Sequence, residues 1–321
     1  MLESRVKGTI VGAAIGDALG TLVEEMDRET VKKSYGTAII GFVNPSPNSV
    51  CPFLKKGQFS HETQIFIKVL EVYAEKGYFD EVAYLEKLIE WAKDEKSHRY
   101  PAGSHLNAAL GYAGGLDIDE ARVKSCDIDG AVPAVAGGIY RWDSPSDAYE
   151  EGCLIASVTH RDETLIDTAG VLAVAVSEVI SGRVLLDTPE DRFGFLEVLR
   201  EYAQTETVKS YLDLVTNVLQ KNVETMDDAI LLIGNGSYAP EAFSLAVYVL
   251  LQHPRDFRKA VLAAANTYGE FGGDTDAIAF ITGALSGGYL GFEAIPRDWV
   301  ECLESSDYLL LLSEKLLEKI E

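Results

Sequence analysis

The stretch GGDTDAIAFITGALSGGYLG (residues 272–291) joins two aspartates, one residue apart, to an apolar run with a small residue at every fourth position. Ala279, Gly283, Gly287 and Gly291 share one face of a helix, because residues i and i+4 lie on the same side. Glycine inside a helix is less favourable than alanine by roughly 1 kcal/mol, so such a stripe needs a compensating gain. We expect that gain to be the close approach of another helix.

A second stripe of the same kind lies near the start of the chain. Gly8, Gly12, Gly16 and Gly20 recur every four residues. The two stripes either face each other or face a common neighbour. If they face each other, the contact brings Asp17, Glu24 and residues 274–276 into one region of the molecule.

The rest of the chain shows helical and not alternating periodicity, which predicts an all-α fold. No turn-rich segment is long or biased enough to be a linker, so we expect a single domain over residues 1–321. Apolar residues recur at helical intervals in residues 64–76, 80–92, 164–181, 194–203, 209–220, 241–252, 256–268 and 307–320.

The overall charge limits the partners. The chain has 28 Lys+Arg against 51 Asp+Glu, a net charge of -23. This charge repels nucleic-acid phosphates and anionic membrane surfaces, so we expect neither as a partner. The four cysteines form no C-x-x-C pair, and we recognise no export signal or membrane span, so we expect a cytoplasmic protein with reduced thiols.

The two aspartates of residues 272–276 have two interpretations. Asp274 or Thr275 is a suitable N-cap, and an acid in the first turn complements the helix dipole. The D-x-D pattern also offers oxygen ligands to a hard divalent cation. Asp274 and Asp276 converge only if Asp274 lies in the loop, since on a regular helix they would diverge by about 200°.

Four segments, in this order and spacing, resemble the ADP-ribosylglycohydrolase family over nearly the whole chain. They are GDALG (16–20) followed by Val23-Glu24, GQFSHETQ (57–64), Thr159-His160 and GGDTDAI (272–278). The resemblance implies an all-α orthogonal helical bundle in one domain. It also implies a binuclear magnesium or manganese centre that releases ADP-ribose from an N- or O-glycosidic linkage.

The resemblance implies a metal-ligand set with two departures from the family pattern. His61 stands where the family has a carboxylate, and Ala277 stands where it has a hydroxyl. Magnesium accepts imidazole poorly, whereas transition metals accept mixed nitrogen and oxygen sites, so a single ion or a transition metal is an alternative to a magnesium pair. The candidate ligands are Ser60, His61, Glu62, Asp274 and Asp276.

Further roles follow from the same resemblance. Glu24 and Glu62 are candidate catalytic residues, with Glu24 in an acid or base role. Tyr268 and Phe271 are candidates for stacking on adenine, with core packing as the alternative. The candidate substrate-binding residues are Asp17, Gly272, Gly273, Tyr268 and Phe271.

Other family landmarks are altered. Members often have Gly-Asn-Gly followed by Met-Arg where this chain has SCDIDGAVP (125–133), which changes how the distal ribose and phosphates are held. Ser104 and His105 are expected in a loop that offers backbone contacts to a diphosphate.

Three functions remain open from the sequence. The first is a metal-dependent hydrolase of small-molecule or protein-linked ADP-ribosyl or related ribosyl conjugates. The second is a protein that binds ADP-ribose or another nucleotide without turnover, which His61 and Ala277 favour. The third is a structural protein that reuses the scaffold.

Overall fold

The computed structural model describes residues 1–100, 103–221, 223 and 225–320, and its regular elements are helices. Isolated bridges pair Val123 with His160 and Asp127 with Tyr238. The α-helices are α1 (Leu2–Gly20), α2 (Arg28–Tyr35), α3 (His61–Lys76), α4 (Glu81–Lys93), α5 (Gly103–Ala113), α6 (Ile118–Ala121), α7 (Ala134–Tyr140), α8 (Pro145–Ser157), α9 (Glu163–Ser181), α10 (Pro189–Tyr202), α11 (Glu206–Lys221), α12 (Met226–Ile233), α13 (Ala239–Gln252), α14 (Phe257–Ala265), α15 (Thr275–Leu290), α16 (Arg297–Cys302) and α17 (Ser306–Ile320). Two 3₁₀ helices, η1 (Ile128–Gly130) and η2 (Phe292–Ala294), complete the regular structure of these residues.

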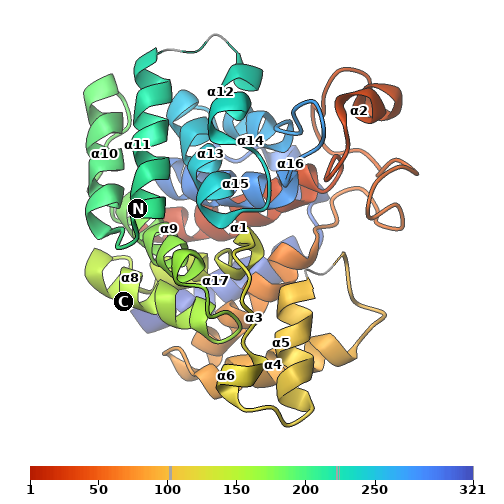
Figure 1. Ribbon diagram of the computed structural model, residues 1–321, viewed down its shortest axis with the longest axis vertical. Coiled ribbons are helices and arrows are strands. Elements are labelled where there is room, and N and C mark those ends of the chain that lie inside the picture. The colour runs from red at the N-terminus through yellow and green to blue at the C-terminus, as the bar shows by residue number, and fades with distance from the viewer. Residues whose placement is uncertain (101–102, 222, 224, 321) are drawn as a thin grey trace.

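Helices α1 and α15 lie against each other through the middle of the molecule (Figure 1). A methyl group added at Gly8 would overlap the carbonyl oxygen of Gly287, and one at Gly12 would overlap that of Gly283. Gly16 is equally close to Ala279. The two stripes therefore face each other, which confirms the first of the two arrangements that the sequence left open.

The other helices surround this pair as an all-α orthogonal bundle (Figure 1). All eight segments with predicted helical periodicity are helices in the structure. The largest difference at a C-terminal end is in α14, which ends at Ala265 and not at residue 268. The helices that were not predicted include α5 and α8, with 11 and 13 residues, and five short ones whose fewer than nine residues carry too little periodicity to recognise, α2, α6, α7, α12 and α16.

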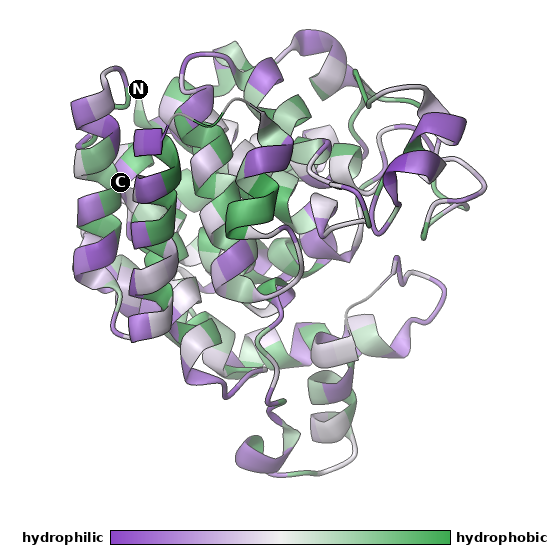
Figure 2. Cartoon of the chain, turned by 45° about the horizontal axis from the view of Figure 1, so that its top comes forward, coloured by the Kyte–Doolittle hydropathy of each residue, from purple (hydrophilic) through white to green (hydrophobic). Residues whose placement is uncertain are grey.

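The hydrophobic core runs without interruption from α1 to α17, and apolar residues gather on the central helices (Figure 2). Helix α9 is long and apolar enough, by composition alone, to cross a membrane. However, 83% of its most apolar window is buried inside the protein. This burial is typical of the core helix of a globular protein.

The central pair also positions a polar region. The C-terminal end of α1 continues through a turn to Glu24, which meets the N-terminal end of α15. The N-terminal end of α3 and the short helix η1 close in from the other side. Charged side chains from four separate stretches of sequence therefore meet beside the core.

Candidate active site and metal centre

A cavity of about 650 Å³ opens where these segments meet. It contains the two aspartates of the D-x-D motif and the histidine at the start of α3. The described residues that line it are Glu24, Glu25, His61, Tyr100, Gly103, Asp127, Asp129, Gly236, Ser237, Phe271, Gly272, Gly273, Asp274 and Asp276.

Glu24, and not Asp274, caps helix α15. The Glu24 Oε2 atom accepts the backbone N–H groups of Thr275 at 2.7 Å and Asp276 at 3.2 Å. Asp274 occupies the N-cap position but makes no side-chain cap hydrogen bond, so the expectation of an Asp274 cap is wrong. The cap carboxylate comes instead from a residue 251 positions earlier in the chain, which leaves the Asp274 side chain free to face the cavity.

The double glycine allows the chain to reach this position. Gly272 has a φ of +101°, where a side chain would be strained, and a Cβ there would lie 2.8 Å from the Glu25 carbonyl oxygen. A Cβ at Gly273 would overlap the side chain of Asn235. Residues 272–273 therefore pass close to the Glu25 and Asn235 segments. Asp274 lies in the loop before α15, which is the position it needs for its carboxylate to converge with that of Asp276.

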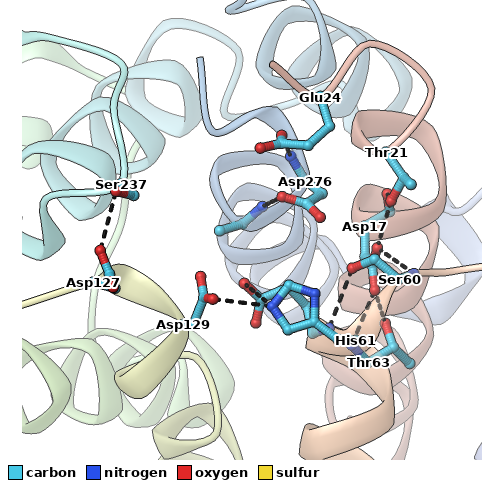
Figure 3. A network of polar contacts seen from close by, with 12 residues as sticks. Asp17, Thr21, Glu24, Ser60, His61, Thr63, Asp127, Asp129, Ser237 and Asp276 are labelled. Atoms are coloured by element: carbon cyan, nitrogen blue, oxygen red, sulfur yellow. Dashed lines mark hydrogen bonds and ion pairs between the residues drawn. The ribbon is translucent and has the colours of Figure 1, made fainter. Parts of the chain in front are cut away.

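Asp17 lies behind the cavity wall and holds the start of α3. Its carboxylate accepts the backbone N–H groups of Ser60 at 2.8 Å and Thr63 at 2.9 Å, and the hydroxyls of Thr21 and Thr63 (Figure 3). Asp17 is fully buried and does not line the cavity, so its predicted contact with substrate is corrected to a positioning role. The Ser60 hydroxyl caps α3 by accepting the Glu62 N–H, and its role as a metal ligand stays a prediction.

His61 and Glu62, the first residues of α3, meet Asp129 of η1. The His61 Nε2 atom lies 3.0 Å from Asp129 Oδ2 and 3.8 Å from Glu62 Oε1 (Figure 3). All three side chains are nearly inaccessible to solvent. The imidazole thus stands between two carboxylates, an arrangement that holds either a proton or a metal ion.

The buried carboxylates oppose one another's ionisation. Burial and the charges of Asp276 and Asp274 raise the pKa of Glu24 well above its ordinary value. Burial and the nearby carboxylates likewise raise the pKa of Glu62 and Asp274. Burial and Asp17 raise the pKa of Asp276 to about 6. Without a cation, this region therefore retains protons that its carboxylates would lose in water.

In the His61–Asp129 pair the pKa shifts favour the charged forms of both side chains. Burial lowers the pKa of His61, but the Asp129 carboxylate outweighs it and the net shift is upward. Burial raises the pKa of Asp129, but His61 outweighs it and the net shift is downward. Two neighbouring histidines stay neutral, since burial lowers the pKa of His105 to about 3 and that of His160 to about 4.

Two groups of side chains have the geometry of a cation site. In each group one ligand atom per residue lies within 4.8 Å of the others, the first being Glu24, Asp274 and Asp276 and the second His61, Glu62 and Asp129. Glu62 Oε1, Asp274 Oδ1 and Asp276 Oδ2 are buried without a hydrogen-bond partner. Unpartnered buried carboxylate oxygens are costly, and a divalent cation is the species that satisfies several at once.

The remaining predicted residues divide between the cavity and the core. Phe271 is 92% exposed and lines the cavity with Gly272 and Gly273. Tyr268 is buried, does not line the cavity and donates its hydroxyl to the Thr37 carbonyl, so its predicted stacking on a base is corrected to core packing. Ser104 and His105 are buried in the first turn of α5 and not in a loop, so the expected loop is corrected to a helix.

Sequence reasoning missed Asp127, Asp129 and Ser237. Asp127 and Asp129 form the same D-x-D pattern that drew attention to Asp274 and Asp276. The Ser237 hydroxyl donates to Asp127 at 3.2 Å. Both residues line the cavity on the side opposite His61 (Figure 3). The repeated D-x-D was the signal that would have identified this wall.

Known proteins resemble the chain over its full length. The family model described as ADP-ribosylglycohydrolase matches residues 1–321. An uncharacterised protein of Archaeoglobus fulgidus is 31% identical over 99% of this chain and 97% of its own length. The ADP-ribosylarginine hydrolase Tri1 of Pseudomonas putida is 24% identical, covering 98% of this chain and 78% of its own length.

Two further comparisons agree. Human ADP-ribosylhydrolase ARH3 is 25% identical, covering 98% of this chain and 93% of its own length. A solved structure titled "ADP-ribosylglycohydrolase-related protein complex" superposes with a TM-score of 0.77 at 21% identity, covering 100% of this chain and 99% of that chain. At that identity the structural match establishes the fold.

Proposed function

Because the chain belongs to the ADP-ribosylglycohydrolase family, we propose that it is a metal-dependent hydrolase that releases ADP-ribose or a related ribosyl group from a glycosidic conjugate. The observation that carries the proposal is the pair of buried, unpartnered carboxylate oxygens of Asp274 and Asp276 at one cavity, with a third such oxygen on Glu62 buried beside His61. The names of the relatives, an ADP-ribosylarginine hydrolase and ADP-ribosylhydrolases, support the reaction class.

The residues present fit a divalent cation. Glu24, Asp274 and Asp276 form the first group of candidate ligands, and His61, Glu62 and Asp129 form the second. By family resemblance the ion is magnesium or manganese, and His61 favours a single ion or a transition metal. When bound, such an ion orients the ribose hydroxyls and lowers the pKa of water in the site.

The reaction needs a base, an acid and negative charge near the anomeric carbon. The oxygen of water forms a bond to the anomeric carbon while the bond to the nitrogen or oxygen of the aglycone breaks, and its electron pair stays with the aglycone. Glu24 accepts a proton from the water at its carboxylate, and a protonated carboxyl group such as Glu62 gives one to the leaving atom. The buried carboxylates stabilise the oxocarbenium character that develops on the ribose.

Raised pKa values suit this division of roles. Burial raises the pKa of both Glu24 and Glu62 toward neutral pH, where a carboxyl group exchanges protons most readily; Glu24 acts as the base in its ionised form and Glu62 as the acid in its protonated form. The Glu24 cap on α15 also fixes its position, because Oε2 is bound to two backbone N–H groups.

The test is release of product from arginine-, serine- and small-molecule ribosyl conjugates, with and without the ADP moiety. Metal-stripped protein is reconstituted separately with magnesium, manganese and zinc. We expect release that requires a metal and is lost in Asp274→Asn. The matched control is Asp298→Asn, an exposed carboxylate paired with Arg258 far from the cavity in sequence. Absence of release with every metal from folded protein would reject the hydrolase.

A second candidate, binding without turnover, is favoured by Ala277. This residue is fully buried at the first turn of α15 and supplies a methyl group where the family motif has a hydroxyl. Binding of a ribosyl conjugate or of its free ribosyl product, with no release under any metal, would identify this function instead.

A further inference from the structure

We propose that Asn235 is a positioning residue for the metal centre, because it fixes the backbone that carries Asp274 to the cavity. The inference rests on the metal centre of the proposed function and adds a residue that acts through Asp274 and not on the substrate. Asn235 belongs to the Gly-Asn-Gly-Ser segment of residues 234–237, which joins α12 to α13. Asn235 stays outside the lining of the cavity, whereas the two residues that follow it line the cavity.

Three hydrogen bonds tie Asn235 to the connection between α14 and α15. Its Nδ2 atom donates to the carbonyl oxygen of Thr267 at 2.6 Å and to that of Gly272 at 3.0 Å. Its backbone carbonyl accepts the N–H group of Asp274 at 2.8 Å. One residue therefore holds the start of the connection and also the backbone on both sides of Gly273.

The loop before α15 is enclosed on two sides. A Cβ at Gly273 would overlap the Asn235 side chain, and a Cβ at Gly272 would lie 2.8 Å from the Glu25 carbonyl oxygen. The Gly273 carbonyl in turn accepts the N–H group of Glu25 at 3.2 Å. A change in the contacts of Asn235 therefore moves the backbone at Asp274.

The backbone also places the Asp274 carboxylate. Asp274 makes no side-chain cap hydrogen bond with α15, and its Oδ1 atom is buried without a hydrogen-bond partner. This oxygen is therefore aimed by the conformation of the chain at residue 274. Metal ligands have to be held close to their productive geometry by the groups around them, and Asn235 is such a group.

The same loop is attached to the wall that carries the other group of candidate ligands. The Ser237 carbonyl accepts the N–H group of Ile128 at 2.8 Å. Ile128 is the first residue of η1 and precedes Asp129. Asn235 thus binds the chain at Asp274, and two residues later the loop binds η1. The loop of residues 234–237 therefore sets the spacing between the two walls.

Asn266 offers a matched control in the same part of the chain. Its Nδ2 atom also donates to two backbone carbonyls, that of Ile39 at 2.8 Å and that of Leu262 at 2.7 Å, and its Oδ1 atom accepts the Ile39 N–H. Both asparagines are half-buried. However, the partners of Asn266 lie outside residues 272–274. Loss of either side chain leaves carbonyl groups without a donor, so both losses should lower stability.

The experiment measures manganese binding to metal-stripped protein by electron paramagnetic resonance, together with urea unfolding. Asn235→Ala should raise the Kd for manganese by about tenfold or more, because it removes a group that orients a metal ligand. Asn266→Ala should leave this Kd nearly unchanged, although both variants should unfold at lower urea. Saturating manganese should return the kcat of Asn235→Ala close to that of the wild type, because every candidate ligand is still present.

Asn235→Asp separates position from charge. The aspartate keeps the shape of the side chain, but it loses both donors and sets a carboxylate against the carbonyl oxygens of Thr267 and Gly272. A negative charge beside the cavity would by itself tighten cation binding, whereas displacement of Asp274 weakens it. We expect a raised Kd for manganese in this variant, and tighter binding than in the wild type would overturn the inference.

The remaining outcomes distinguish the inference from the function on which it rests. An unchanged Kd in Asn235→Ala, or an equal rise in Asn235→Ala and Asn266→Ala, would overturn the positioning role and leave the proposed hydrolase standing. A wild type that binds manganese but releases no product from any conjugate would overturn the hydrolase and leave the positioning role standing. A wild type that binds no metal ion would overturn both.

Discussion

Two adjacent regions of the α1–α15 pair differ in what holds them together. Along the glycine stripes, backbone meets backbone, and the contact leaves no room even for a methyl group at Gly8, Gly12 or Gly16. One turn further, the same two segments place Glu24 against the N-terminal end of α15 and turn Asp274 and Asp276 toward a cavity. The first region is stabilised by packing alone, while the second concentrates like charges that only protons or cations can balance.

The comparison shows how a folding contact fixes a chemical site. The close approach of the two backbones brings Oε2 of Glu24 within 2.7 Å of the Thr275 N–H. Substitutions in the stripe should therefore lower stability, and substitutions in the cavity should lower activity without unfolding the protein.

The largest effect is expected from Glu24→Gln. The amide oxygen of glutamine preserves the cap on α15, but the base is lost, so kcat/KM should fall by about 10³. Steady-state release of the ribosyl product measures the loss, and circular dichroism checks the fold. Glu25→Gln, the same change at the next residue, should stay within a few-fold of the wild type, and an equal loss in both variants would reject the assigned role.

The next largest effect is expected on stability, from a substitution in the glycine stripe of α1. Gly16→Ala places a methyl group on the Ala279 carbonyl oxygen and should lower the free energy of unfolding by about 3 kcal/mol or more. Urea unfolding measures this change. Gly194→Ala in α10, where an added Cβ has no neighbour within 4 Å, should instead stabilise by up to about 1 kcal/mol. Equal changes at the two glycines would show that the stripe is not a packing contact.

The third prediction tests the cavity by its effect on stability. The pKa of Asp276 is raised to about 6 from its ordinary 3.8, so in metal-free protein its ionisation opposes folding. Asp276→Asn and wild type should be equally stable below pH 4. The wild type should then lose stability relative to Asp276→Asn as pH rises from about 4 to about 6, and the deficit should level off at about 3 kcal/mol above that pH. Unfolding curves across this range give the difference, and a constant difference would contradict the shift.

The smallest effect is expected from His61→Asp. A carboxylate in place of imidazole gives an all-oxygen site, which should shift the ratio of magnesium to zinc affinity toward magnesium by roughly tenfold. Competition binding of the two metals to stripped protein measures the ratio. An unchanged ratio would show that His61 does not contact the ion.

The sequence predicted that each glycine stripe packs closely against another helix, because a four-residue repeat places the glycines on one helix face; it left open whether the two stripes face each other or a common neighbour. It predicted the long helices for a similar reason, since many turns repeat the same apolar face. It did not predict that Glu24 caps α15, because that contact joins residues 251 positions apart and depends on tertiary packing.

The site was predicted only on the side where a motif is continuous in sequence. Asp274 and Asp276 stand together in a recognisable pattern, and the structure brings both to the cavity. Asp129 lies 68 residues from His61, and only folding of η1 against α3 makes them partners at 3.0 Å. Tyr268 and Phe271 looked alike in sequence, but one is core and the other is exposed because a single tight turn separates them.

The most direct test of the central claim is manganese binding to metal-stripped protein, measured by electron paramagnetic resonance. The account predicts that the wild type and Asp298→Asn hold one or two manganese ions per chain, whereas Asp276→Asn, correctly folded, holds fewer and more weakly. Absence of bound manganese in the wild type, or equal binding in Asp276→Asn, would contradict the assignment of the cavity carboxylates as a metal centre.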